Sequence, residues 1–208
     1  MDARMDNYHA WVIETDADIL KSGLLEMLKM SEFAVLGFEE DFQSDRYMAA
    51  WILGESHLAI HVFLEDNETY VELTSCIKEK SDKFKKIFES TFKLTRVGKE
   101  NETHKINGKA MGNYDSWIKV TDPNMLKKGL KVMLEESKFL TSKFIEYKFQ
   151  PEGHTAVWML NGGHLAIHTF PDKDKTYVQL SSGRGIEIGK FTERFKTTFE
   201  QTCEDPPC

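Results

Sequence analysis

The amino-acid sequence predicts an α+β fold in which one α/β unit occurs twice, with two antiparallel sheets packed face to face as an αββα sandwich. Three observations support it: segments of the first half recur in the second half, strand-like alternation follows a helix-like segment in each half, and a second helix-like segment follows the strands. A unit with helices on one face of its sheet leaves the other face uncovered, which favours packing of the two sheets against each other.

The repeat is visible as matching segments at a nearly constant offset. The pair Asn7-Tyr8 recurs 106 residues later as Asn113-Tyr114. The segment HLAIH at 57–61 recurs at 164–168, an offset of 107, so one inserted residue separates the two spacings. The expected organisation is a first unit over 1–95, a linker over 96–112, a second unit over 113–200 and a tail over 201–208.

Each unit is expected to begin with a short strand that leads into a helix. In the first unit we expect the strand over Trp11–Glu14, with Thr15 or Asp16 as the N-cap of the helix. The next residues place apolar side chains at helical spacing, which predicts one buried helix face. These residues are Ile19, Leu20, Leu24, Leu25, Met27 and Leu28.

Three or four strands are expected after this helix, followed by a second helix. In the strand expected over 57–63, Leu58 and Ile60 alternate with His57 and His61, so its two faces differ in polarity. The other strands are expected over 35–42, 47–53 and 70–76. Phenylalanines and one isoleucine at helical spacing predict a core-facing second helix; they are Phe84, Ile87, Phe88 and Phe92.

The composition is typical of a soluble globular protein, with 40% hydrophobic and 29% charged residues in a chain of 208. The formal net charge of −7 disfavours nucleic acid as a partner, because phosphate binding needs clustered basic residues. The longest apolar run, Met48–Leu53, is far too short to span a membrane. Three cysteines (Cys76, Cys203 and Cys208) without a signal-peptide pattern predict a cytoplasmic protein without a disulfide framework.

The residues that carry chemistry are concentrated in the first half. Glu55, Ser56 and His57 are followed by His61, and Cys76 lies 20 residues after Ser56. Such a serine and histidine pair also occurs in structural roles, and no GxSxG, P-loop, GxGxxG or CxxC motif is present. Histidines four residues apart on a strand are too distant to bind one ion without a bend, so we expect no metal site.

This stretch resembles the S-adenosylmethionine decarboxylases, the pyruvoyl-dependent enzymes of polyamine and spermidine synthesis. The similarity lies in the pattern Glu-Ser-His-x-x-Ile-His, here Glu55–His61, and in the cysteine 20 residues after the serine, here Cys76. Both halves match the family unit, and the layout is similar to that of the fused-pair members. The resemblance implies that the chain cuts itself between Glu55 and Ser56, which makes Glu55 a new C-terminus. Ser56 then becomes a pyruvoyl cofactor that forms a Schiff base with the substrate.

The resemblance also implies a site that draws residues from both halves. Ser56 and Cys76 are expected from the first half, with Cys76 as the acid that protonates the substrate. Thr155 and His168 are expected from the second half, where they would assist self-cleavage. Thr155 replaces the serine that is usual in the family.

The two halves differ at these positions in a complementary way. The second half has Gly163 and Gly183 at the positions of the cleaved serine and the cysteine. The first half has Met48 at the position of the auxiliary hydroxyl. One composite site therefore keeps every expected part, whereas the other has lost three of four, which favours a working enzyme over a decayed one.

The resemblance further implies contacts with the substrate. Phe149 is expected to stack against adenine, Asp172 to bind the ribose hydroxyls, and Glu14 to face the substrate. The expected partner is thus a small molecule, S-adenosylmethionine, with no nucleic acid or membrane, and the protein is expected as a monomeric pseudo-dimer or a homodimer. Two alternatives stay open: a pyruvoyl-dependent decarboxylase of ornithine or arginine, and a non-catalytic regulatory homologue.

Overall fold

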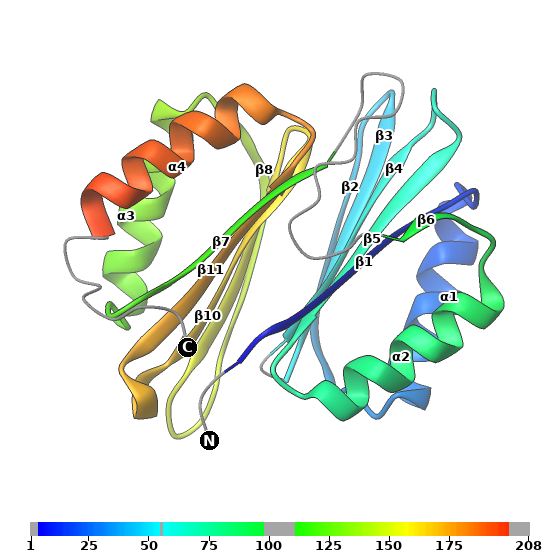
Figure 1. The fold of residues 1–208 in the computed structure, drawn as a ribbon, viewed down its shortest axis with the longest axis horizontal. Coiled ribbons are helices and arrows are strands. Elements are labelled where there is room, and N and C mark those ends of the chain that lie inside the picture. The colour runs from blue at the N-terminus through cyan, green and yellow to red at the C-terminus, as the bar shows by residue number, and fades with distance from the viewer. Residues whose placement is uncertain (1–3, 55, 98–110, 200–208) are drawn as a thin grey trace. The chain divides into compact units, whose positions relative to one another are not determined.

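The computed structural model of the chain describes residues 4–54, 56–97 and 111–199, and the chain forms two compact units. In the first unit six antiparallel strands form one sheet in the order β2-β3-β4-β5-β1-β6, and two helices lie on one face of it (Figure 1). The elements are β1 (Asp6–Val12), α1 (Ala17–Met30), β2 (Val35–Phe42), β3 (Arg46–Leu53), β4 (Ser56–Phe63), β5 (Glu68–Ser75), α2 (Lys78–Thr91) and β6 (Leu94–Val97).

The second unit repeats the order of helices and strands from β1 to α2, and its five antiparallel strands form a sheet in the order β7-β11-β10-β9-β8 (Figure 1). The predicted α+β class and the predicted repetition of one α/β unit are therefore confirmed. The elements are β7 (Gly112–Ile118), α3 (Pro123–Glu136), β8 (Thr141–Lys148), β9 (His154–Leu160), β10 (Gly163–Phe170), the 3-10 turn η1 (Pro171–Lys173), β11 (Lys175–Ser182) and α4 (Gly185–Phe199).

Each unit has its hydrophobic core between its helices and one face of its sheet. In β4 the alternation is as predicted, because Leu58, Ile60 and Val62 belong to this core whereas His57 and His61 do not. Burial of each large apolar side chain stabilises the unit by roughly 1.5–3 kcal/mol. Helix residues that are fully buried in the first core are Leu20, Leu24, Leu28, Phe84 and Phe88, and those in the second are Leu126, Leu130, Phe191 and Phe195.

The first helix of each unit begins at an aspartate. The Asp16 carboxylate accepts hydrogen bonds from the backbone N–H groups of Asp18 and Ile19, at 2.9 and 3.0 Å, so Asp16 rather than Thr15 is the N-cap. The Asp122 carboxylate accepts from the N–H of Met125 at 2.7 Å in the second unit. The same capping chemistry therefore begins the first helix of both repeats.

Two features of the first unit differ from the sequence expectation. β1 starts at Asp6 rather than Trp11, because polar residues such as His9 lie on it, and their polarity hides the strand from an apolar pattern. β6 lies where the linker was expected to begin: Arg96 pairs with Trp11, and its guanidinium lies 4.1 Å from the centre of the Trp11 ring. Residues 98–110 of the expected linker and the tail with Cys203 and Cys208 lie outside the described residues.

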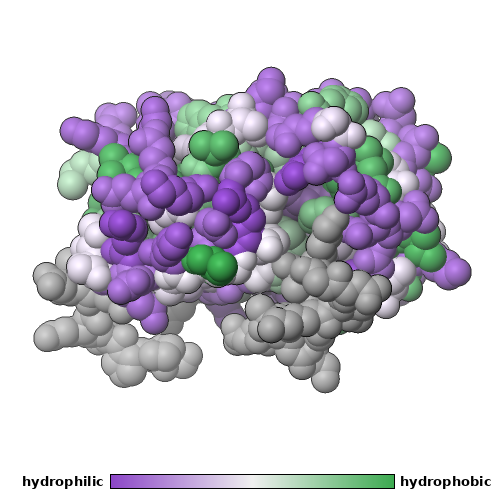
Figure 2. Space-filling view, turned by 90° about the horizontal axis from the view of Figure 1, so that it is seen from above, coloured by the Kyte–Doolittle hydropathy of each residue, from purple (hydrophilic) through white to green (hydrophobic). Residues whose placement is uncertain are grey.

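The surface shown in Figure 2 is mainly hydrophilic, with separated hydrophobic side chains. Exposed large apolar residues are scattered over several elements, as is common for globular proteins; examples are Phe42, Met125, Leu140 and Ile186. Within the described ranges, every helix falls short of the length and apolar character that a bilayer crossing requires.

Candidate active site

Ser56 is the first residue of β4 and is completely buried. It stands opposite Ser75, the last residue of β5, in the antiparallel register. The Ser56 hydroxyl donates a hydrogen bond to the Ser75 oxygen at 2.9 Å. The Ser75 oxygen also accepts a hydrogen bond from the backbone N–H of Ile77, at 3.0 Å, just before α2. The predicted nucleophile is thus fixed in orientation by a second hydroxyl.

Cys76 follows Ser75 directly and is half-buried, and it takes part in no disulfide among the described residues. Because β4 begins at Ser56 and its neighbour β5 ends at Ser75, Ser56 and Cys76 lie at the same end of two adjacent strands. The structure therefore brings together the two residues that were expected from the first half. Glu55, the residue expected on the other side of the cut, lies outside the described residues.

Thr155 and His168 form the second pair, within the second unit. They stand opposite each other on β9 and β10, and the Thr155 Oγ1 and His168 Nδ1 atoms lie 3.0 Å apart in a hydrogen bond. Both residues are 1% exposed. The sequence named these residues from a family pattern, and the strand register explains their contact, because directly opposed side chains on one face of a sheet are close neighbours.

The corresponding pair in the first unit has lost its hydroxyl. Met48 stands opposite His61 on β3 and β4, in the register that Thr155 and His168 have in the second unit. A methionine sulfur is only a weak acceptor and donates no hydrogen bond. Of the two equivalent histidines, His168 is therefore the one that has a threonine hydroxyl opposite it on the preceding strand.

The second unit leaves no space for a side chain at Gly163, the position that corresponds to Ser56. A Cβ atom placed on Gly163 would lie 2.2 Å from the Ser181 carbonyl oxygen and 2.8 Å from the Ser182 Cα. Both of these neighbours are backbone atoms, so a serine does not fit at Gly163 without a backbone shift. The glycine in place of the nucleophile is thus accompanied by packing that excludes any side chain there.

Burial keeps two histidines of the second unit uncharged. Desolvation lowers the pKa of His168 to about 3, and the nearby His154 lowers it further in the same direction. Desolvation alone lowers the pKa of His164 to about 3. At neutral pH the His168 ring is therefore a neutral imidazole, which offers one donor and one acceptor nitrogen and is suited to exchange a proton with the Thr155 hydroxyl.

These two histidines should make the protein less stable in acid. Their ordinary pKa is 6.5, so between about pH 6.5 and about 3 the unfolded chain takes up protons that the folded chain excludes. The stabilisation is fully present above pH 6.5 and decreases by roughly 1.4 kcal/mol per histidine for each pH unit below it. We expect urea denaturation between pH 7 and 4 to show this slope and His164→Asn or His168→Asn to reduce it. An unchanged slope in both variants would contradict this assignment.

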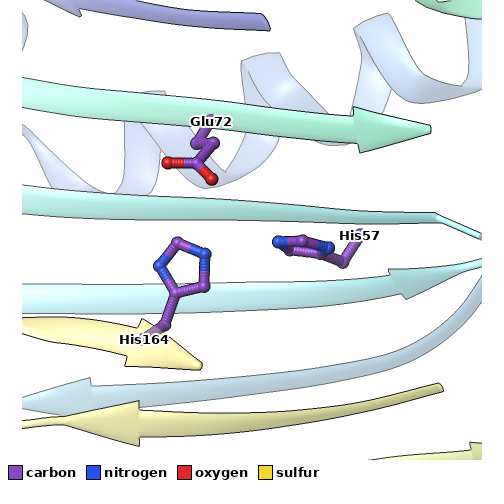
Figure 3. Close-up of side chains that lie close together, drawn as sticks. All are labelled: His57, Glu72 and His164. Atoms are coloured by element: carbon purple, nitrogen blue, oxygen red, sulfur yellow. The ribbon is translucent and has the colours of Figure 1, made fainter. Parts of the chain in front are cut away.

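A buried carboxylate was missed by the sequence analysis. Glu72 on β5 is completely buried, and the Tyr70 hydroxyl donates a hydrogen bond to it at 2.5 Å. Figure 3 shows Glu72 and His57 as sticks, and their ligand atoms lie within 4.8 Å of each other. The signal was present in the alternation of β5, where Val71 and Leu73 belong to the core and Glu72 therefore points to the other face. Ionisable groups buried in this way are more frequent at functional sites than elsewhere.

The two residues of the second unit that were expected to bind substrate lie just beyond strand ends, Phe149 after β8 and Asp172 after β10. Phe149 lines a cavity of about 320 Å³ together with Pro123, at the start of α3, and Thr169. Thr169 follows His168 on β10, and consecutive side chains of a strand point to opposite faces. Asp172 is exposed in η1.

Glu14 makes local contacts in the first unit. Its carboxylate accepts hydrogen bonds from the N–H groups of Thr15 and Asp16, at 2.9 and 2.8 Å, and so it fixes the turn before α1. This contact accounts for Glu14 structurally and leaves its expected substrate contact as a prediction.

One comparison with known proteins, a family-model match over part of the chain, agrees with the sequence resemblance. Residues 115–203 match the model of the S-adenosylmethionine decarboxylase family. Among solved structures, the adenosylmethionine decarboxylase from Aquifex aeolicus VF5 is 18% identical over 43% of this chain and 79% of its own, with a TM-score of 0.37. A putative glycine cleavage system transcriptional repressor is 5% identical over 93% of this chain and 90% of its own, with a TM-score of 0.26. No curated protein matches the chain.

Proposed function

We propose that this chain, whose second repeat belongs to the S-adenosylmethionine decarboxylase family, is a self-processing pyruvoyl-dependent decarboxylase. The observation that carries the proposal is that each repeat keeps functional side chains that the other repeat lacks. The second repeat holds a hydroxyl and an imidazole 3.0 Å apart, where the first has Met48 opposite its histidine. The first repeat holds Ser56 and Cys76, where the second has glycines. Independent decay of the two repeats would not favour this complementary pattern.

The proposed processing begins with an acyl shift. The Ser56 hydroxyl oxygen bonds to the carbonyl carbon of residue 55, the C–N bond breaks, and the nitrogen takes up the proton that the hydroxyl gives up, which yields an ester and a free amine. Loss of the Ser56 α-proton then expels the carboxylate of residue 55. Tautomerisation and hydrolysis by one water molecule release ammonia and leave a pyruvoyl group at residue 56. The neutral His168 imidazole suits the proton transfers of these steps.

The pyruvoyl group supplies a carbonyl that condenses with the substrate amine and accepts the electron pair left when CO₂ departs. The residues around Ser56 fit a group formed there, because the serine is buried and its hydroxyl is already oriented by Ser75. Cys76 lies at the same strand end, so it is the proposed donor of the proton to the substrate α-carbon. We propose that Thr155 and His168 complete the same site.

The role of Cys76 leads to a prediction that separates processing from turnover. Cys76→Ala should leave self-cleavage largely intact but lower kcat for decarboxylation about 10²-fold or more, because a positioned general acid contributes about 10²–10⁴-fold. The measurements are the fraction of cleaved chain and the release of CO₂. Cys203→Ala is the control, and equal CO₂ release from the Cys76 and Cys203 variants would contradict the assignment.

S-adenosylmethionine is the proposed substrate, in a polyamine-forming reaction. The test compares release of labelled CO₂ from carboxyl-labelled S-adenosylmethionine, ornithine and arginine by the cleaved protein. We expect release from S-adenosylmethionine, and Phe149→Ala should raise its KM by about fivefold if the ring contributes about 1 kcal/mol by stacking. Release from ornithine or arginine alone would instead identify an amino-acid decarboxylase.

A non-catalytic homologue that regulates a related enzyme is the second candidate. It is favoured by one observation: the family match begins at residue 115 and so does not include Ser56 or Cys76. On this alternative the chain stays uncut and releases no CO₂ from any of the three substrates.

A further inference from the structure

Ser75 is a second hydroxyl at the proposed cleavage site, and none of the roles assigned above includes it in the reaction. It is completely buried and stands opposite Ser56 at the end of β5. Its oxygen accepts two hydrogen bonds, one from the Ser56 hydroxyl at 2.9 Å and one from the Ile77 N–H at 3.0 Å. A hydroxyl has one proton to donate, so the Ser75 proton is left for a third partner.

The second repeat shows where such a proton goes. Ser182 is the counterpart of Ser75, and its oxygen likewise accepts a backbone N–H two residues later, from Arg184 at 3.1 Å. The Ser182 hydroxyl donates to the carbonyl oxygen of Gly162 at 2.8 Å. The same carbonyl accepts the Gly183 N–H at 2.9 Å. Gly162 precedes Gly163, the counterpart of Ser56, so this carbonyl corresponds to the one that the proposed self-cleavage would attack.

We propose that Ser75 is a catalytic residue of self-processing, which takes the proton of the attacking Ser56 hydroxyl and passes its own proton to the carbonyl oxygen of the preceding residue. The inference rests on the proposed function, since it assigns a residue to that reaction. It differs from the proposed roles of Thr155 and His168, because Ser75 belongs to the same repeat as the nucleophile and contacts it directly.

The step balances without an outside reactant. As the Ser56 oxygen bonds to the carbonyl carbon, its proton moves to Ser75, and the Ser75 proton moves to the carbonyl oxygen. The product is a neutral tetrahedral adduct with one new hydroxyl. When the C–N bond then breaks, the proton of that hydroxyl passes to the nitrogen, which gives the ester and the amine. Transfer through an oriented hydroxyl avoids the separation of charge in a buried site, where an unpaired charge is costly.

The experiment follows the rate of cleavage of full-length chains that carry single substitutions. Ser75→Ala is expected to slow cleavage by about 10²-fold or more, in the range of a lost proton-transfer group. Ser75→Thr keeps the hydroxyl and should stay within about tenfold of the unsubstituted protein. Ser182→Ala is the matched control, because it removes the equivalent hydroxyl and the equivalent bond to a helix-start N–H, but stands beside a glycine instead of the nucleophile.

Each of the other possible outcomes would overturn either the proposed function or the proposed role of Ser75. If the unsubstituted chain stays intact, the proposed function itself is wrong. If it cleaves and Ser75→Ala cleaves at the same rate, only the role of Ser75 is wrong. An equal slowing in Ser182→Ala would show that the loss reflects packing rather than proton transfer. Accumulation of an ester in Ser75→Ala, detected as rapid cleavage on addition of hydroxylamine, would show that the acyl shift proceeds without Ser75, and would also overturn the role.

Discussion

Ser56→Ala is expected to leave the chain whole and to abolish decarboxylation. The hydroxyl of Ser56 is both the nucleophile of the proposed acyl shift and the source of the pyruvoyl carbonyl, so alanine removes cleavage and cofactor together. We expect no fragment and no CO₂ release above background under conditions that cleave the unsubstituted protein completely. Electrophoresis of the purified chain and release of labelled CO₂ are the measurements.

The fold should survive this change, since the lost hydrogen bond runs to Ser75, which keeps its bond from the Ile77 N–H. Ser56→Cys supplies a different nucleophile at the same position and should cleave, although more slowly. A Ser56→Ala protein that still appears as two fragments would place the cut elsewhere and remove the basis of the mechanism.

Substitutions in the second repeat are expected to block a cut in the first. Thr155→Ala and His168→Ala should each slow cleavage before Ser56 by about 10²–10⁴-fold, the usual contribution of a positioned proton-transfer group. The two buried side chains stand directly opposite each other and share a hydrogen bond of 3.0 Å. This bond holds the imidazole in place to exchange a proton with the hydroxyl. The measurement is the first-order rate of fragment formation.

The repeat supplies matched controls for this prediction. His61 occupies on β4 the position that His168 occupies on β10, and it is also buried. His61→Ala should therefore cost comparable stability but leave the cleavage rate within a fewfold range of the unsubstituted protein. If His61→Ala and His168→Ala slow cleavage equally, the two repeats do not divide the chemistry, and the assignment of His168 fails.

The sequence predicted best those elements whose apolar face, seen in the local sequence pattern, is the face that packs in the core. The apolar face of β4 is the core face, and the apolar helix residues Leu20, Leu24 and Leu28 are completely buried. The sequence predicted β1 to be shorter than it is, because this strand carries the polar residues Asn7 and His9. Their partners on β5, Thr74 and Glu72, are polar as well. A prediction based on the spacing of apolar residues does not detect strand segments in which both partners are polar.

The residues of the candidate site also fall into those that the sequence predicted and those that it missed. Ser56, Cys76, Thr155 and His168 were named from a motif. The antiparallel register then accounts for the contact between Thr155 and His168 and places Ser56 and Cys76 at the same end of adjacent strands. Ser75 carried no such signal, because serine at the end of a strand is common and its partner is known only once the register is known. Glu72 was likewise missed, since burial of a carboxylate depends on what the sheet face contacts and not on its own sequence neighbours.

The central claim is that the chain cuts itself before Ser56, and the mass of the purified protein tests it most directly. We predict two fragments, residues 1–55 and 56–208, with the larger one resistant to N-terminal sequencing because a pyruvoyl group replaces its amine. A single uncut chain of 24.0 kDa with a free serine hydroxyl at residue 56, after incubation under folding conditions, would contradict the proposal.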